Sequence, residues 1–277
     1  MENLGDTLKD NECSESKKFL NSVDFYKLKQ MWDASAPFSH ISIDDFLKSN
    51  IAEAISGEFP DFKSEDWRVY DNQIEVKKLQ NHWDKFGLGT YKLMQFLNSR
   101  WFISQLEILT GCSLFPDYGL NGGGLHSHKR GGKLNVHLDY SIHPKLKLER
   151  RVNLLIYLTP NWEDKWGGFL GLWGSEDGGK APGDLVKTIA PTFNRAVLFD
   201  TTQNSWHGLP DEIMCPEGVT RNSLAVYYLC EPRDQADDRG KALFAPYKDQ
   251  VDDPDVLSLI KRRSDVNLAA GAYGDKK

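Results

Sequence analysis

The chain has 277 residues, 40% of them hydrophobic, which is enough to bury the core of one large domain. Its formal net charge is -6 at pH 7, so the composition does not indicate the basic surface of a nucleic-acid-binding protein. It contains no run of the ~20 apolar residues that a membrane-spanning helix needs. We therefore expect neither a nucleic acid nor a membrane as its partner.

The four cysteines, Cys13, Cys112, Cys215 and Cys230, are scattered and include no Cys-x-x-Cys pair. Such spacing is typical of reduced thiols and not of a disulfide framework. The acidic start of the chain lacks the basic residues and the apolar run of a signal peptide. The sequence therefore predicts a soluble, cytoplasmic protein.

The first part of the chain has the pattern of helices that support a sheet. Residues 1–18 are polar and charged, and we expect them to be poorly ordered. Apolar residues recur at helical spacing in three segments: Asp24–Trp32, Ile43–Glu58 and Lys92–Leu109. Two short strands are predicted between them, at Trp67–Tyr70 and Ile74–Val76. Residues 1–110 are therefore interpreted as a mostly helical support region.

After Gly111 the pattern changes to short strand-like runs separated by turn residues. These runs are Leu134–Tyr140, Val152–Leu158, Phe169–Trp173, Asp184–Ile189, Ala196–Phe199 and Ser223–Leu229. Strands at this spacing without helices between them predict an antiparallel sandwich or jelly roll over 111–233. The extension 234–277 carries a short amphipathic helix around Val256–Lys261. We expect residues 1–277 to be one catalytic domain, mainly β with flanking helices.

The segment Leu134–Asp139 alternates apolar and polar residues. Side chains two apart on a strand share a face, so His137 and Asp139 point to the same side, away from the apolar positions. A further histidine, His207, follows far downstream. Two histidines and one carboxylate on one face of a metal leave its other face open, as a mononuclear non-haem iron site requires.

Two other strands bring polar side chains to the same interior. In Val152–Leu158, the phenol of Tyr157 lies on the face opposite Val152. In the last strand, Arg221 and Ser223 share one face. A buried guanidinium requires an anion and matches a carboxylate with two parallel hydrogen bonds, so this pair suits the far end of a dicarboxylate such as a 2-oxo acid.

At this point the sequence resembles the Fe(II)- and 2-oxoglutarate-dependent dioxygenases, and among them the prolyl hydroxylases of the hypoxia-inducible-factor type. The resemblance covers roughly Leu134–Arg233. The matching motifs, in chain order, are His137-Leu138-Asp139, Arg150-Arg151-Val152-Asn153-Leu154-Leu155-Ile156-Tyr157-Leu158-Thr159, Trp162, Gly167-Gly168-Phe169-Leu170, Asn194-Arg195-Ala196-Val197-Leu198-Phe199, His207-Gly208 and Arg221-Asn222-Ser223-Leu224.

The resemblance implies a double-stranded β-helix in which His137, Asp139 and His207 hold Fe(II). It also implies that 2-oxoglutarate chelates the metal while Arg221, helped by Tyr157 and with Ser223 beside it, binds the far carboxylate. The implied reaction uses O2, releases CO2 and succinate, and hydroxylates an unactivated C–H, with ascorbate in support. The loop between His207 and Arg221 is longer than prolyl hydroxylases usually have.

Four further residues are candidates for substrate contact. His126 and His128 lie between glycines in Gly119–Gly132, which we therefore interpret as a flexible lid. The family often places a tyrosine in this region, and the alternative is that His126 or His128 replaces the contact of that tyrosine. Arg150 begins a strand and is predicted at the mouth of the barrel. Trp206 is a candidate wall of the substrate pocket.

Several functions remain open on these residues. By resemblance, the favoured substrate is a prolyl ring in a protein or peptide. The same chemistry on a free amino acid, a sugar or another metabolite is the alternative, because fold and cosubstrate site do not fix the substrate. A non-enzymatic cupin-like metal-binding protein and a zinc hydrolase are the rivals from other classes, since both also use such ligand sets.

Overall fold

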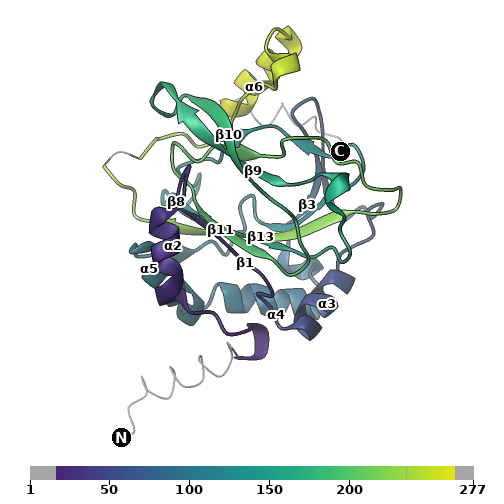
Figure 1. Ribbon diagram of the computed structural model, residues 1–277, viewed down its shortest axis with the longest axis vertical. Helices are drawn as coiled ribbons and strands as arrows, with labels where there is room; N and C mark the ends of the chain where they lie inside the picture. The colour runs from purple at the N-terminus through teal and green to yellow at the C-terminus, as the bar shows by residue number, and fades with distance from the viewer. Residues whose placement is uncertain (1–16, 235, 266–277) are drawn as a thin grey trace, which may run out of the picture.

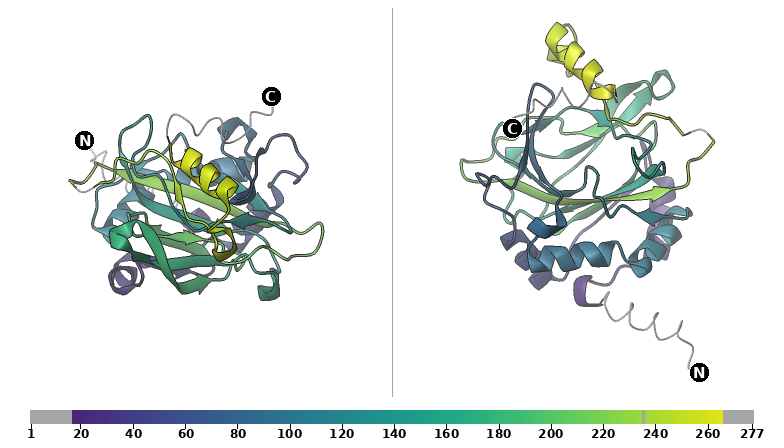
Figure 2. Two further views of the ribbon diagram at one scale, coloured as in Figure 1. Left: turned by 90° about the horizontal axis from the view of Figure 1, so that it is seen from above. Right: turned by 180° about the vertical axis from the view of Figure 1, so that it is seen from behind.

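The computed structural model describes residues 17–234 and 236–265 (Figure 1). Its strands form two antiparallel sheets that pack face to face, with helices on the outer side of the larger one (Figures 1 and 2). Between the sheets, Leu170 and Leu172 of the smaller sheet pack against Val197 and Phe199 of the larger. This is the sandwich that the strand pattern predicts.

The larger sheet has nine strands in the order β1-β11-β8-β13-β5-β3-β2, with β4 beside β13 and β6 beside β3. Its strands are β1 (His40–Ile43), β2 (Arg68–Asp71), β3 (Glu75–Gln80), β4 (Phe115–Pro116), β5 (Gly124–His128), β6 (Lys133–Leu134), β8 (Glu149–Tyr157), β11 (Ala196–Asp200) and β13 (Arg221–Cys230). Three of these come from the region predicted to be mostly helical. β2 and β3 fall where short strands are predicted.

The smaller sheet has five strands in the order β10-β9-β12-β7-β14. Its strands are β7 (His137–Leu138), β9 (Leu170–Glu176), β10 (Ala181–Ile189), β12 (His207–Gly208) and β14 (Leu243–Phe244). The strands β12, β7 and β14 are only two residues long, and no apolar alternation marks β12 or β14 in the sequence. Two of these short strands, β7 and β12, carry the candidate metal ligands His137 and His207.

Four helices cover the outer face of the larger sheet (Figure 1). They are α2 (Phe25–Ala34), α3 (Ser49–Gly57), α4 (Leu88–Leu97) and α5 (Arg100–Thr110), while α6 (Pro254–Ser264) lies on the far side of the molecule. Short 3-10 turns occur at η1 (Trp83–Lys85), η2 (Asp164–Trp166), η3 (Asp177–Gly179) and η4 (Lys248–Gln250). α6 confirms the helix predicted around Val256–Lys261, and Asp253 caps its first turn.

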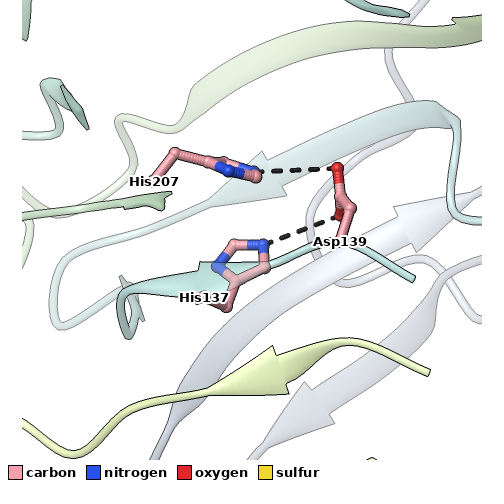
Figure 3. A group of neighbouring side chains, drawn as sticks. All are labelled: His137, Asp139 and His207. Atoms are coloured by element: carbon pink, nitrogen blue, oxygen red, sulfur yellow. Dashed lines mark ion pairs between the residues drawn. The ribbon is translucent and has the colours of Figure 1, made fainter. Parts of the chain in front are cut away.

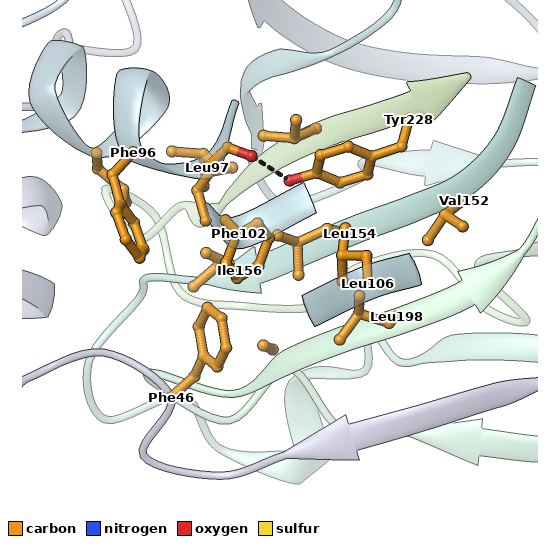
Figure 4. Packing of buried hydrophobic residues seen from close by; sticks show 14 of the residues in the cluster. Phe46, Phe96, Leu97, Phe102, Leu106, Val152, Leu154, Ile156, Leu198 and Tyr228 are labelled. Carbon is orange, nitrogen blue, oxygen red and sulfur yellow. Dashed lines mark hydrogen bonds between the residues drawn. The ribbon is translucent and has the colours of Figure 1, made fainter. Parts of the chain in front are cut away.

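The core between helices and sheet contains the apolar faces of the central strands. Val152, Leu154 and Ile156 of β8 are fully buried there, against helix residues such as Phe102 and Leu106 (Figure 4). The hydroxyl of Tyr228 on β13 donates a hydrogen bond of 2.9 Å to the carbonyl of Leu97, at the end of α4 (Figure 4). The opposite faces of β8 and β13 are thereby turned toward the second sheet.

Two predicted helices have different limits. The segment Lys92–Leu109 is two helices, because α4 ends at Leu97 and Ser99 caps α5 by accepting a hydrogen bond from the amide of Phe102. The helix predicted from Ile43 begins only at Ser49, because Ile43 belongs to β1, which pairs with β11 at Ala196. Within the described residues, no helix has both the length and the apolar content needed to cross a membrane.

Residues 1–16, with Cys13, and residues 266–277 lie outside the described residues, so the order and thiol state predicted for them stay predictions. Among the described residues, Cys112, Cys215 and Cys230 form no disulfide. The division into 1–110, 111–233 and 234–277 as parts of a single domain also stays a prediction.

Candidate metal centre

The structure brings His137, Asp139 and His207 together between the two sheets (Figure 3). His137 on β7 and His207 on β12 are directly paired across the two strands, so their rings lie side by side, with centroids 4.3 Å apart. Nε2 of His137 is 3.8 Å from Oδ1 of Asp139, and Nε2 of His207 is 3.7 Å from Oδ2. Ligand atoms of all three residues lie within 4.8 Å of one another.

Both imidazoles are oriented by the backbone two residues before them. Nδ1 of His137 lies 2.9 Å from the carbonyl oxygen of Asn135, and Nδ1 of His207 lies 2.8 Å from that of Ser205. A ring that donates through Nδ1 presents the lone pair of Nε2, and this is how metal-ligating histidines are usually held. Each Nε2 is therefore directed at the space in front of Asp139.

The donor set fits a divalent metal ion. The distances from each Nε2 to the carboxylate are too long for hydrogen bonds, and Oδ2 of Asp139 is buried without a hydrogen-bond partner among the described residues. Burial, followed by the neighbouring His207, lowers the pKa of His137 to about 3, and burial also lowers the pKa of His207. The two rings are thus neutral ligands beside an ionised carboxylate, which is the state that binds a metal.

Arg150 is buried beside the candidate metal ligand Asp139. The prediction that it lies at the mouth of the barrel is therefore wrong. Its side chain is buried between the rings of Tyr140 and Tyr227, with its guanidinium carbon 3.4 Å from each ring centre. Nη1 of Arg150 is 3.3 Å from Oδ1 of Asp139. Burial raises the pKa of Asp139, but Arg150 and then the two histidines outweigh it and hold that pKa at about 2.

A β-bulge explains why Arg150 points inward. Val152 pairs with Tyr228 and Arg150 pairs with Leu229, so two steps along β8 face one step along β13. The extra residue, Arg151, breaks the alternation, and it forms an ion pair with Asp200. Arg150 therefore takes the face of Asn153 and Leu155, which lines the cavity, and not the face of Val152.

The metal centre opens into a cavity of about 250 Å³, which is near the small end of ligand sites. Arg221 and Ser223 line it, together with the three candidate ligands. Arg221 is 4% exposed, and none of the described residues places a carboxylate within ion-pair distance of its guanidinium. A buried cation in this state needs an anion from outside the chain.

The position of Arg221 depends on Gly168. Nε of Arg221 donates a hydrogen bond of 2.6 Å to the carbonyl of Gly168. Gly168 has φ +73°, and a Cβ atom there would lie 2.9 Å from Cδ of Arg221, so only glycine allows the approach. Tyr157 completes the group, with its ring centre 4.8 Å from the guanidinium carbon.

His126 and His128 lie on a strand, not on a flexible lid. β5 (Gly124–His128) is paired on one side with β13 and on the other with β3, in the middle of the larger sheet. Gly124 has φ +102°, and a Cβ atom there would lie 2.2 Å from the carbonyl oxygen of Gln80. The glycines therefore allow close packing of strands, and both histidines line the cavity from a rigid element.

Trp206 does not line the cavity, which corrects its prediction as a pocket wall. It is fully buried with Val136 and Leu138 in a cluster on the other side of the smaller sheet. The alternation explains this, because Trp206 is adjacent to His207 and therefore points to the opposite face of β12.

Several residues of the site were not identified from the sequence. Phe244 of β14 pairs with His137 and stacks on its ring, with centroids 5.0 Å apart and planes 21° apart. Gln250 accepts a hydrogen bond from the side chain of Asn135, the residue whose carbonyl orients His137. No motif marks Phe244 or Gln250, since both come from the extension 234–277.

Comparisons with known proteins agree with this geometry. Residues 123–229 match the model of the 2OG-Fe(II) oxygenase superfamily. Over 79 residues the chain is 33% identical to prolyl 3-hydroxylase OGFOD1 of Xenopus laevis and 28% identical to that of Mus musculus. Each match covers 28% of this chain but only 15% and 14% of the relative, so the chain spans a small part of those proteins.

Solved structures share the fold at low identity. A prolyl hydroxylase from Trichoplax adhaerens, solved with a hypoxia-inducible-factor peptide, matches 74% of this chain and 90% of its own with a TM-score of 0.50 and 20% identity. The non-haem epimerase SnoN of nogalamycin biosynthesis matches 80% and 85% with a TM-score of 0.51 and 12% identity. The fold is therefore the double-stranded β-helix, and the match of residues 123–229 to the 2OG-Fe(II) oxygenase model lies in the part of the chain where the motifs predict such a domain.

Proposed function

We propose that this chain is an Fe(II)- and 2-oxoglutarate-dependent hydroxylase in which His137, Asp139 and His207 hold the metal. One observation supports this above the others: the three ligands and the buried, acid-free guanidinium of Arg221 line one cavity. When bound, the metal and its cosubstrate supply the oxidation of an unactivated C–H by O2, with release of CO2 and succinate. Ascorbate is expected to support turnover by keeping the iron ferrous.

Two groups of residues would bind the two ends of the cosubstrate: Arg221 with its neighbours at one end, and the metal with its ligands at the other. Arg221 offers a planar guanidinium to the 5-carboxylate of 2-oxoglutarate, and Gly168 fixes that guanidinium by accepting its Nε–H. Tyr157 lies beside it with a buried hydroxyl, and Ser223 lines the same wall. Fe(II) held by His137, Asp139 and His207 would have coordination positions left for the other end of the cosubstrate.

Arg150 has a supporting role toward the metal. Because its guanidinium faces Oδ1 of Asp139, Oδ2 is the oxygen left for the ion. The stacking of Arg150 between Tyr140 and Tyr227 holds that guanidinium in one place. The carboxylate is thus presented through one oxygen, which keeps coordination positions free for cosubstrate and O2.

The substrate we favour is a prolyl residue in a protein or peptide. Support comes from the curated relatives, which are named prolyl 3-hydroxylases, and from the fold shared with a prolyl hydroxylase that was solved with a peptide. A free amino acid, a sugar or another metabolite is the alternative target of the same chemistry. The cytoplasmic location stays a prediction, and microscopy of the tagged full-length chain tests it.

The test is the formation of succinate from 2-oxoglutarate by the purified chain with Fe(II), O2 and ascorbate. Arg221→Lys keeps a positive charge but removes the planar fork, and we expect it to raise the KM for 2-oxoglutarate by about tenfold or more. Metal binding should stay unchanged. Arg100→Lys on α5, where the side chain is 66% exposed, is the matched control and should behave as the original chain.

The rival functions predict different results in the same assay. A cupin-like metal-binding protein forms no succinate under any condition. A zinc hydrolase needs neither 2-oxoglutarate nor Arg221, so unchanged kinetics in Arg221→Lys would contradict the proposal.

A further inference from the structure

The imidazole of His128 is buried in the wall of the cavity with no hydrogen bond to either ring nitrogen. His128 is 4% exposed, and within the described part of the chain neither its Nδ1 nor its Nε2 has a hydrogen-bond partner. A neutral imidazole has one N–H donor and one acceptor nitrogen, and burying such groups without partners costs free energy. Because His128 lines the cavity, a bound molecule can supply the partner.

The other histidines are bonded differently. Among the described residues, each of the other buried or half-buried histidines has a ring nitrogen at 2.8–3.2 Å from a hydrogen-bonding group of the backbone: His40, His126, His137, His143 and His207. His82 is exposed to solvent. In this part of the chain, His128 is therefore the histidine that combines burial with two unpaired ring nitrogens.

β5 places His128 directly beside Arg221. The two residues are paired across β5 and β13, so their side chains share a face of the sheet, with Cβ atoms about 4.5–5.5 Å apart. Tyr157, close to the guanidinium of Arg221, belongs to β8, the strand on the other side of β13. An anion held by Arg221 is thus flanked by Tyr157 from one neighbouring strand and by His128 from the other.

Arg221 leaves room for a further donor to such an anion. Its Nε–H is already donated to the carbonyl of Gly168, so the terminal N–H groups remain for a carboxylate. The two oxygens of a carboxylate have about four lone-pair sites, more than one edge of a guanidinium fills. In a buried site, an acceptor left without a donor weakens binding. The N–H group of His128 is well placed to serve as that donor.

The surroundings of His128 keep it neutral. Burial, followed by Arg221 and Lys77, lowers the pKa of His128 well below the ordinary value for histidine. The backbone of Arg221 acts in the opposite direction, but it lies beyond hydrogen-bond distance and could satisfy at most one ring nitrogen. Lys77 is itself paired with Glu75, whose Oε2 is 3.2 Å from Nζ of Lys77. His128 therefore offers an N–H group without adding a charge to the cavity.

We propose that His128 donates a hydrogen bond to the far carboxylate of the cosubstrate, together with Arg221, and is a cosubstrate-binding residue and not a substrate contact. This inference rests on the proposed function and deepens it by naming a further residue that selects 2-oxoglutarate among 2-oxo acids. The metal ligands bind one end of the cosubstrate, while Arg221 and His128 recognise the other.

The test is isothermal titration calorimetry of the full chain loaded with Zn(II), which supports no oxidation. Two ligands are compared: 2-oxoglutarate, and 2-oxopentanoate, in which a methyl group replaces the far carboxylate. His128→Phe keeps an aromatic ring but removes the N–H group. We expect it to raise the Kd of 2-oxoglutarate by about tenfold or more, as the loss of a hydrogen bond to a charged group does. The Kd of 2-oxopentanoate should change by less than about twofold, because this ligand has no far carboxylate to accept that hydrogen bond.

Further variants locate the effect at the N–H group. His128→Asn and His128→Gln carry an amide N–H near the positions of Nδ1 and Nε2, and one of them should recover most of the affinity for 2-oxoglutarate. His82→Phe makes the same change at an exposed histidine and should bind both ligands as the original chain does. The affinity for Zn(II) should be equal in all these variants. Melting temperatures show which variants are folded, and His128→Leu replaces His128→Phe if the latter does not fold.

The inference is overturned if the variant without an N–H group binds 2-oxoglutarate as well as the original chain does, or if neither amide variant recovers affinity. Equal weakening of both ligands also overturns it, because that result indicates only a structural role.

The succinate assay separates this inference from the proposed function. Binding of 2-oxoglutarate that depends on His128, without succinate formation, rejects only the proposed function. Succinate formation with unchanged affinity in His128→Phe rejects only the role of His128. If the original chain binds no 2-oxoglutarate, both proposals fail.

Discussion

Gln250 and Asn135, 115 residues apart, are joined by a hydrogen bond of 2.7 Å in which the Asn135 side-chain amide donates to Oε1 of Gln250. Nε2 of Gln250 in turn donates to the carbonyl of Gln73 at 2.9 Å. The backbone carbonyl of Asn135 accepts from Nδ1 of His137. Through these hydrogen bonds, Gln250 connects the candidate ligand His137 to the extension 234–277 and to the hairpin β2–β3.

The first prediction concerns the hydrogen bond between Asn135 and Gln250. Gln250→Ala should weaken Mn(II) binding to the chain by about tenfold or more, because outer partners of ligating histidines typically contribute that much. Gln250→Glu keeps the acceptor for Asn135 and should lose less. Electron paramagnetic resonance titration with Mn(II) measures both affinities.

Gln105→Ala on α5 is the control for Gln250, because within the described part of the chain the side-chain amide of Gln105 donates only to the hydroxyl of the adjacent Ser104. Equal Mn(II) affinities of Gln250→Ala and Gln105→Ala would show that the hydrogen bond from Asn135 to Gln250 does not position His137.

The second prediction concerns the ligands themselves. Mn(II) at 100 times its Kd should stabilise the original chain by ~2.7 kcal/mol, because a ligand that binds only the folded state adds that free energy. His137→Ala and His207→Ala should lose this gain. Thermal unfolding with and without EDTA measures it, and exposed His82→Ala should keep it. Full stabilisation by Mn(II) in both ligand variants would place the metal elsewhere.

The third prediction concerns Arg150 and Asp139. Arg150→Gln leaves the buried carboxylate unpaired and should lower the free energy of unfolding of the metal-free chain by about 3 kcal/mol or more. Asp139→Asn in the same chain removes the orphaned charge and should restore part of the loss. Urea unfolding of the two single variants and the double variant measures the coupling. Strictly additive losses would mean that the pair contributes no interaction.

The fourth prediction concerns the core. Tyr228→Phe removes the donor to the buried carbonyl of Leu97 and should cost about 1 to 3 kcal/mol of unfolding free energy. Tyr26→Phe, where the ring is 73% exposed on α2, should cost almost nothing. Urea unfolding compares them, and succinate formation should persist in both folded variants. Equal stabilities would show that water replaces the bond.

The parts of the site that alternation governs could be predicted from the sequence. His137 and Asp139 are directed to the same side because residues two apart on a strand share a face. The same rule separates Tyr157, beside Arg221, from Ile156, which packs under the helices. These relationships need only local backbone geometry, which a short sequence window contains.

The other features of the fold and the site depend on contacts between residues that are far apart in the sequence. Arg150 follows a bulge whose presence is decided by pairing with β13. The glycines beside His126 read as a loop, although one of them allows β5 to approach β3 closely. The break between α4 and α5 at Asn98 interrupts an apolar stripe that continues through it.

The pairing of β14 with β7 also sets an order of events. Phe244 and Gln250 reach His137 from more than 100 residues further along the chain. During translation, both histidines and the aspartate emerge before this support exists. Nascent chains that end between His207 and Gln250 therefore contain every candidate metal ligand but lack the full support that orients His137. Tight metal binding should begin only once Gln250 has been synthesised and has folded back.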